Sequence, residues 1–175
     1  MSRNPYLLRL SLAIACVAAA LGAFTAVAAA ATKASPVLKM EMVSVTVGSK
    51  TVKHDVLVNG AGHAVYLLTG DSSKTPKCTS STCLGDWPAV TTSASKPVVG
   101  KGVTGKVAIW THKGIHQLTI NGHPLYTYLA DSSAAVATGN GLKSFGGTWW
   151  VLSGSGATAS IKTSSGGGSG GGAGW

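Results

Sequence analysis

One segment of the chain occurs twice, and this duplication constrains the fold more than any other feature. Residues 59–73 return as residues 121–133, and the two segments align once Ala61 and Gly62 are left out. A repeat of this kind marks a supersecondary unit that was copied, and the two copies pack together to close one core. The duplication therefore predicts a single domain made of two related halves.

Apolar and polar residues alternate around each copy with the period of a β-strand. The pattern predicts strands over residues 43–47, 56–58 and 64–69, and again over 106–111, 115–120 and 124–129. The Asn121-Gly122 pair between apolar runs is a strong hairpin signal. No segment has a helical period of useful length. We therefore predict an all-β fold, a small domain (43–153) of two related β-meander repeats, the first about 43–91 and the second about 106–153.

The two ends of the chain differ in composition from this domain. Residues 1–31 have a short basic start, a mostly apolar stretch and a run of small residues, which is typical of a signal peptide. The alternative is an uncleaved anchor, since the stretch is nearly long enough to span a bilayer. Residues 32–42 are predicted to be a linker, and residues 154–175 a disordered Gly/Ser-rich tail. We expect an extracytoplasmic protein, secreted or associated with the cell envelope.

The cysteines bear on that location. Cys16 lies within the apolar stretch in a poor match to a lipoprotein processing site, so no lipid anchor is expected there. Cys78 and Cys83 are the other two thiols, and outside the cytoplasm they are expected to form a disulfide. Half of a zinc site is the alternative, but a second pair of ligands at the usual spacing is missing.

The charge of the chain limits its partners. The formal net charge is +9, and removal of Arg3 and Arg9 with the signal leaves twelve lysines against five acidic residues, about +7. Lysines scattered singly, without arginine, argue against nucleic-acid binding. We expect attraction to anionic envelope polymers or to a membrane surface, and solubility alone is the simpler alternative.

Acidic residues are scarce, so their position is informative. Asp71 and Asp131 fall at the same place in the two copies, each five residues after a tyrosine, Tyr66 or Tyr126. An aspartate at a strand end accepts backbone N–H groups and holds a turn, which requires no ligand. Ligand binding is the alternative. The repeated Tyr and Asp residues are therefore candidate structural or binding residues.

A tryptophan closes each copy. Trp87 and Trp149 are large side chains in a chain that is only 6% aromatic, and they are most simply core residues of a small β domain. The alternative is a platform for a ligand, which requires exposed rings.

The sequence contains no recognisable catalytic set, and we do not expect an enzyme. No cofactor is predicted, but a metal is an open alternative. His63 and His123 are equivalent in the repeat, and a twofold pairing of the copies would bring them together. With Asp71 and Asp131 they could bind copper or zinc, as in a metal-binding or redox accessory protein. The simpler interpretation is that these histidines are turn residues.

One motif occurs in both copies, as Tyr66-x-Leu68-x-x-Asp71 and as Tyr126-x-Tyr128-x-x-Asp131, and it is accompanied by Trp87-Pro88 and Phe145-Gly146-Gly147-x-Trp149. These motifs resemble a bacterial family of secreted repeats, described as predicted lipoproteins with a Yx(FWY)xxD motif. Tyr128 completes the pattern in the second copy, whereas Leu68 stands at the aromatic position of the first. The resemblance covers roughly residues 43–153, and it implies an extracytoplasmic protein of unknown biochemical function. We therefore expect a non-catalytic binding or structural module with an unknown ligand.

Overall fold

A computed structural model describes residues 35–163, and their regular structure is nearly all β, which confirms the predicted class. The predicted signal peptide, Cys16 and the end of the tail lie outside the described residues. None of the described helices is long and apolar enough to cross a membrane. The elements in chain order are β1 (Leu38–Val47), β2 (Lys50–Asn59), β3 (Tyr66–Leu68), α1 (Ser81–Asp86), β4 (Val107–His112), β5 (Ile115–Ile120), β6 (His123–Pro124), β7 (Val136–Ala137), β8 (Lys143–Ser144) and β9 (Gly147–Val151).

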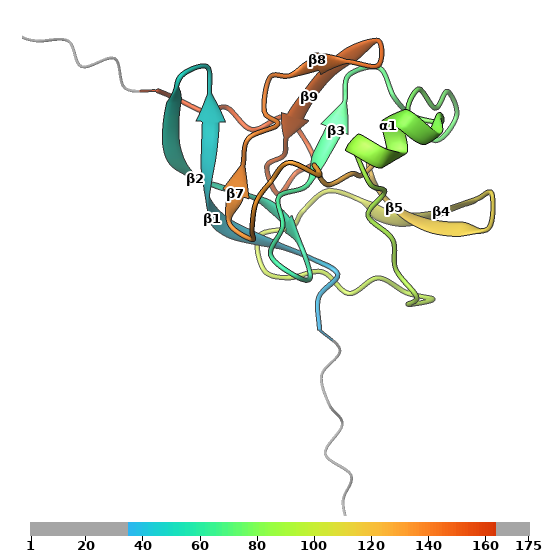
Figure 1. Cartoon of the computed structure of the whole chain (residues 1–175). Coiled ribbons are helices and arrows are strands. Elements are labelled where there is room, and N and C mark those ends of the chain that lie inside the picture. The colour runs from blue at the N-terminus through green and yellow to red at the C-terminus, as the bar shows by residue number, and fades with distance from the viewer. Residues whose placement is uncertain (1–34, 164–175) are drawn as a thin grey trace, which may run out of the picture. The chain divides into compact units, whose positions relative to one another are not determined.

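The strands form three small sheets with the orders β2-β1-β7, β3-β9-β8 and β4-β5-β6. The long hairpin β1–β2 and the shorter hairpin β4–β5 lie on opposite sides of the domain in Figure 1, with β3 and β9 between them. Each hairpin opens one repeat. The Asn121-Gly122 turn predicted from sequence joins β5 to β6, and both residues have the positive φ that such a turn needs.

The two repeats exchange strand partners. Tyr66 and Tyr126 face each other in an antiparallel bridge, and the backbone N–H of each donates to the carbonyl of the other (2.8 and 3.0 Å). Tyr66 also pairs with Val151, two residues after the tryptophan of the second repeat, and Tyr126 pairs with Ala89, two residues after that of the first. Each tyrosine strand thus completes its pairing with the other repeat.

Each hairpin likewise pairs with a segment of the other repeat. The backbone N–H of Leu57 in β2 donates to the carbonyl of Leu152 (2.8 Å), and that of Leu118 in β5 donates to the carbonyl of Val90 (2.7 Å). Leu152 and Val90 follow the two tryptophans at the same distance. The pairing therefore makes Leu57 and Leu118 equivalent, and it relates the repeats by an approximate twofold axis between Tyr66 and Tyr126.

Two clusters of buried residues form the core. The first surrounds the aromatic side chains of both repeats, and the second is aliphatic and lies beneath the β4–β5 hairpin. Both clusters draw on both repeats, as the exchange of strands requires. The second cluster consists of Leu38, Leu57, Val65, Leu67, Val90, Leu118, Ile120, Leu125 and Leu152.

The predicted N-terminal boundary of the domain is wrong. β1 begins at Leu38, inside the stretch 32–42 predicted as linker, and the Leu38 side chain is fully buried.

The short helix α1 was not predicted, because six residues are too few to establish a helical period. It is capped by the Ser80 hydroxyl, which accepts from the backbone N–H of Cys83 (3.1 Å). The predicted disulfide between Cys78 and Cys83 is confirmed, and it fixes the entry to this helix.

The predicted disordered tail begins too early at residue 154. The backbone N–H of Ala159 donates to the carbonyl of Val151 (2.9 Å), and Leu152 forms a bridge with Thr158. The glycines that suggested disorder allow close approach here. Gly156 has a φ of +81°, and a Cβ on it would lie 2.8 Å from the Ile120 side chain. Residues 154–163 therefore belong to the fold.

Candidate functional site

The repeated tyrosines and aspartates form two crossed pairs at the centre of the domain. The Tyr66 hydroxyl donates to Asp131 Oδ2 (2.8 Å), and the Tyr126 hydroxyl donates to Asp71 Oδ2 (2.7 Å). Each hydrogen bond joins a tyrosine of one repeat to an aspartate of the other. We call these two contacts the crossed Tyr–Asp pairs. They were not predicted, because the sequence shows the Tyr and Asp of each copy as neighbours within that copy.

The second oxygen of each carboxylate holds a turn, as predicted. Asp71 Oδ1 accepts from the backbone N–H of Lys77 (2.8 Å). Asp131 Oδ1 accepts from both the backbone N–H and the hydroxyl of Thr138 (2.7 and 2.8 Å). Among residues 35–163, no buried side-chain nitrogen or oxygen lacks a hydrogen-bond partner. Both carboxylates are therefore occupied by groups of the protein.

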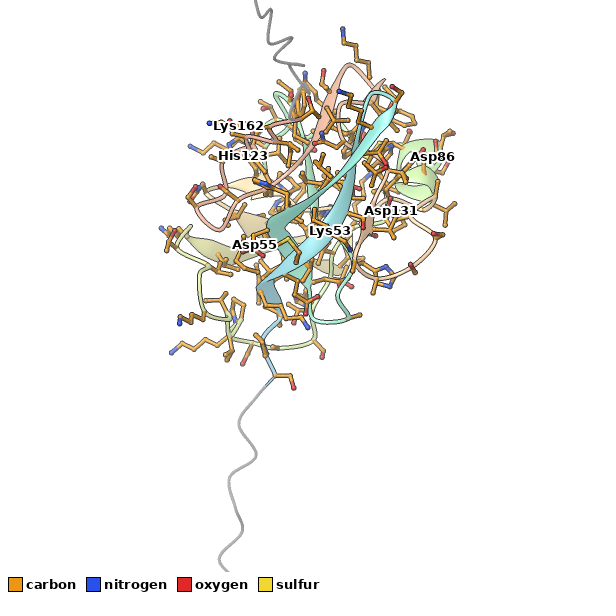
Figure 2. All side chains as sticks on the ribbon, turned by 90° about the vertical axis from the view of Figure 1, so that its left-hand side faces the viewer. Lys53, Asp55, Asp86, His123, Asp131 and Lys162 are labelled. Carbon is orange, nitrogen blue, oxygen red and sulfur yellow. A yellow bond between two sulfur atoms is a disulfide. The ribbon has the colours of Figure 1, made fainter. Side chains whose placement is uncertain are left out.

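These two aspartates differ from the others in the described stretch. Asp71 and Asp131 are 1% and 8% exposed. Asp55 and Asp86 are exposed, and Figure 2 shows them on the β1–β2 hairpin and on α1. A buried carboxylate is costly unless it is hydrogen-bonded, which the crossed Tyr–Asp pairs provide.

The tyrosine hydroxyls are held in their protonated form. Burial, followed by the negative charge of Asp131, raises the pKa of Tyr66 well above its ordinary value. Burial, followed by the hydrogen bond to Asp71, raises the pKa of Tyr126 in the same direction. Neither group is poised to exchange a proton near neutral pH. The crossed Tyr–Asp pairs are therefore suited to holding a structure and not to acid–base chemistry.

The two tryptophans meet at the approximate twofold axis. Trp87 and Trp149 stack with their ring centres 3.8 Å apart and their planes 3° apart. Each tyrosine contacts the tryptophan of its own repeat edge-on, Tyr66 against Trp87 and Tyr126 against Trp149, both at 5.3 Å. Trp87 and Trp149 are 2% and 0% exposed, so they are core residues and not an exposed platform.

Tyr128 extends this stack toward the surface. Its half-buried ring lies on Trp87, with the centres 4.2 Å apart. Gly139 leaves space for both rings, since a Cβ there would lie 2.7 Å from Trp87 and 3.0 Å from Tyr128. In the first repeat the equivalent Leu68 is fully buried and pairs with Trp149. The aromatic at this position thus covers an outer face of the tryptophan stack.

The structure does not bring His63 and His123 together. The two tyrosine strands are antiparallel, and each histidine precedes its tyrosine by three residues, so six residues of strand separate them, on the order of 20 Å. His123 Nδ1 donates to the backbone carbonyl of Asp71 (2.8 Å), and the His63 backbone N–H donates to Asn59 Oδ1 (3.0 Å). In the described part of the chain, no three His, Cys, Asp or Glu side chains could hold a metal ion. Copper or zinc binding stays a prediction.

A hollow over the β4–β5 hairpin contains residues that the sequence analysis did not select. Trp110 of β4 forms part of its wall, and the ring of His112 stacks on Trp110 with the centres 3.6 Å apart. The sequence pattern that could have pointed to Trp110 is the alternation in β4, which places Trp110 on the face opposite Val107 and Ile109. Trp110 is the only large apolar residue on that face, beside Lys106, Ala108 and His112, so the pattern indicates a solvent-exposed face.

Comparison with known proteins adds one finding. A family model described as a secreted repeat of unknown function matches residues 107–153, which correspond to the second repeat. No curated protein and no solved structure matches the chain. The family implies an extracytoplasmic location, in agreement with the prediction from the N-terminal sequence. The second half of this domain, residues 107–153, is thus similar to the secreted repeats of unknown function that this family model describes.

Proposed function

We propose that this protein is a non-catalytic binding or structural module of the extracytoplasmic space, in which the repeated Tyr and Asp residues join the two halves. The observation that carries this proposal is the geometry of the crossed Tyr–Asp pairs. All four side chains are buried and hydrogen-bonded to each other, so none is presented to a substrate. A catalytic carboxylate or phenol must instead reach the reacting atoms.

The partner proposed for the module is an anionic polymer of the envelope or an anionic membrane surface. The chain carries lysines in excess, and ten of them are exposed side chains of the described residues, while two of its four aspartates are buried in the crossed Tyr–Asp pairs. The surface is therefore strongly positive. Such attraction is long-range and weakens with salt.

Copper or zinc binding is the alternative function, and it uses His63, His123, Asp71 and Asp131. Asp71 and Asp131 are already saturated by tyrosine hydroxyls and backbone N–H groups. A metal would have to displace these donors, at the cost of leaving them unpaired in the core. We therefore favour the module without a metal.

The experiment that tests the proposal compares residues 32–175 with a Tyr126→Phe variant. Both proteins are sedimented with insoluble cell-envelope material at low and at high salt, and their melting temperatures are measured alongside. The proposal expects salt-sensitive binding that is equal for the two proteins, together with a lower melting temperature for the variant. An unchanged melting temperature with lost binding would make the motif a ligand site.

Native mass spectrometry of the same protein with added copper or zinc tests the alternative. A stoichiometric metal that is lost in a His123→Ala variant would replace the proposed module by a metal-binding protein. Binding that persists in this variant would be adventitious and would leave the proposal in place.

A further inference from the structure

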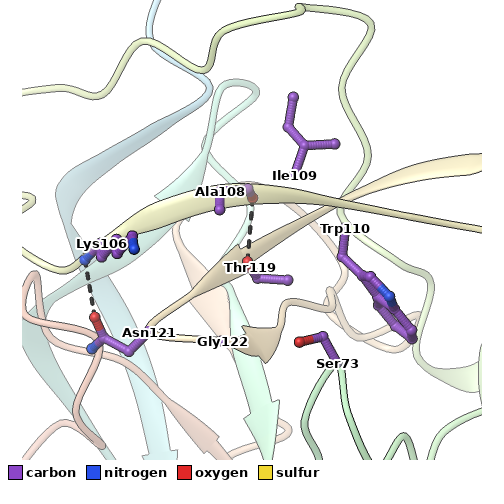
Figure 3. Close-up of a pocket in the computed structure, with 8 residues that line it drawn as sticks. All are labelled: Ser73, Lys106, Ala108, Ile109, Trp110, Thr119, Asn121 and Gly122. Atoms are coloured by element: carbon purple, nitrogen blue, oxygen red, sulfur yellow. Dashed lines mark hydrogen bonds between the residues drawn. The ribbon is translucent and has the colours of Figure 1, made fainter.

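The hollow over the β4–β5 hairpin has the size of a small-ligand site and lies apart from the crossed Tyr–Asp pairs. Its volume is about 440 Å³, within the range of ligand pockets in general. Trp110 and Lys106 stand toward its two ends, with Thr119 between them (Figure 3). We call it the Trp110 hollow. It is lined by Ser73, Lys106, Ala108, Ile109, Trp110, Thr119, Asn121 and Gly122.

A buried hydrogen-bond chain fixes the position of the Trp110 ring. Gln117 is 1% exposed, and its Nε2 donates to the backbone carbonyl of Leu125 (2.9 Å). Its Oε1 therefore faces His112 and accepts from His112 Nε2 (2.9 Å), so this nitrogen carries the proton. The His112 ring in turn stacks on Trp110, with planes 19° apart. The indole is thus held in place before any ligand arrives, which lowers the entropy cost of binding.

This support exists in one repeat only. Because Leu57 and Leu118 are equivalent in the backbone pairing, the position of Gln117 is taken by Val56 in the first repeat. Val56 is fully buried and needs no hydrogen bond. An apolar residue therefore satisfies the fold at this position, and a buried glutamine is the more costly choice. The hydrogen-bonded side chains of Gln117 and His112, which hold Trp110, are therefore not required by the fold.

The Trp110 hollow offers an unused polar group toward each of its ends. Within residues 35–163, the Lys106 ammonium and the Ser73 hydroxyl have no hydrogen-bond partner, and Lys106 is the only charged residue among the eight drawn in Figure 3. The Asn121 side chain is occupied, since it accepts from the backbone N–H of Lys106 (2.9 Å) and donates to the carbonyl of Ser155 (2.8 Å). A ligand in the hollow therefore meets a cation at the Lys106 end and a hydroxyl near Trp110 (Figure 3).

The spacing of the two ends limits the ligand. Lys106 and Trp110 are separated by four residues of extended chain, about 13 Å between their Cα atoms. A ligand that contacts both side chains must be longer than a single ring, apolar on one face and negatively charged. We propose that the Trp110 hollow binds a short stretch of an acidic glycan, with one sugar ring on Trp110 and an acidic group against Lys106. This inference rests on the proposed binding module and names its ligand class.

The test is calorimetric titration of residues 32–175 with an oligogalacturonate, a chain of uronic acids, and with an uncharged glucan of equal length. The inference expects measurable binding of the uronate only. Trp110→Ala is expected to weaken it about tenfold or more, since a central aromatic anchor is lost. Lys106→Gln is expected to weaken it by a similar factor. Lys53→Gln removes the same charge from the exposed face of β2, on another sheet, and serves as the matched control.

Unchanged binding by Lys53→Gln, with loss in the other two variants, would support the site. Equal weakening by Lys106→Gln and Lys53→Gln, with no effect of Trp110→Ala, would overturn it and leave a module that binds anions by net charge alone. Failure to bind the uronate at all would also overturn the inference. The proposed function would still be judged separately, by sedimentation with envelope material. A Trp110→Phe variant retains an aromatic face, so its binding should be intermediate, and an unchanged melting temperature confirms that it folds.

Discussion

The Asp131 carboxylate makes one hydrogen bond that crosses the repeats and two that close a turn. Oδ2 accepts from Tyr66, and Oδ1 accepts from two donors of Thr138. The Tyr66 hydroxyl itself accepts from the backbone N–H of Gly139 (3.3 Å), so the network has no spare donor or acceptor at its centre. Removing any one group leaves another unpaired in the core, which costs more than the bond itself contributes.

Asp131→Asn is expected to lower the free energy of unfolding by about 1 to 3 kcal/mol. The amide has one acceptor oxygen in place of two, so its NH2 group must face either Tyr66 or the donors of Thr138. Chemical denaturation of the variant and of the parent protein gives the difference. Asp86→Asn, on the exposed surface of α1, is the matched control and should change stability little. Equal effects of the two substitutions would contradict a role for the crossed Tyr–Asp pairs.

The raised pKa of Tyr66 and Tyr126 predicts loss of stability at alkaline pH. In the unfolded chain a tyrosine ionises near its ordinary pKa of about 10, whereas the folded protein holds both protons above that value. Below about pH 10 the two tyrosines are protonated in both the folded and the unfolded state, so their full contribution to the free energy of unfolding is present. Above it the unfolded state loses protons first, so stability falls by up to about 1.4 kcal/mol per pH unit for each tyrosine.

Denaturant unfolding at a series of alkaline pH values measures this slope. Tyr126→Phe removes one of the two buried hydroxyls, so the pH dependence of the variant should be about half as steep. Tyrosinate absorbance should rise in step with unfolding for the remaining buried tyrosine. A variant with the slope of the parent protein would show that other groups govern the alkaline transition.

At the scale of elements, the sequence predicts the positions of the strands better than it predicts which strands pair with each other. The strands over residues 43–47, 56–58, 106–111 and 115–120 all lie within or beside observed strands, because alternation is a local property. The pairing of Tyr66 with Val151 joins residues far apart in the chain, and no local pattern encodes it. The crossed Tyr–Asp pairs could not be predicted for the same reason. The Gly/Ser-rich composition led to a wrong prediction of disorder at Gly154 and Gly156, where glycine allows close packing against the core.

The position of the C-terminal boundary can be tested by truncation. Removing residues 164–175 should leave the melting temperature nearly unchanged, because their Gly/Ser-rich composition is too poor in apolar residues to form a core. Removing residues 154–175 should lower it clearly, because Val151 and Leu152 lose their pairing with Ala159 and Thr158. It also uncovers the core that Ala159 and Ile161 contact. Equal melting temperatures for the two truncations would contradict the boundary.

At the scale of the whole molecule, the repeat is smaller than the folding unit. The family match covers residues 107–153, one repeat, but the hydrogen bonds of Tyr126 and Leu118 end on the first repeat, at Asp71 and Val90. Trp149 likewise stacks on Trp87. One repeat alone exposes these groups without partners. Two repeats are therefore needed to satisfy the backbone and close the aromatic core.

The isolated second repeat, residues 106–163, is therefore expected to be unfolded as a monomer. It carries its own Tyr126 and Asp131, so two copies can form the crossed Tyr–Asp pairs between chains in the way that the repeats do within one. Circular dichroism and sedimentation over a range of concentrations should show strand structure appearing together with a dimer, whereas residues 32–163 fold as a monomer. Strand structure in a monomer at low concentration would show that one repeat closes its own core. In a dimer, Asp131→Asn should impair folding more than it does in the full domain, since the substitution alters both crossed Tyr–Asp pairs at once.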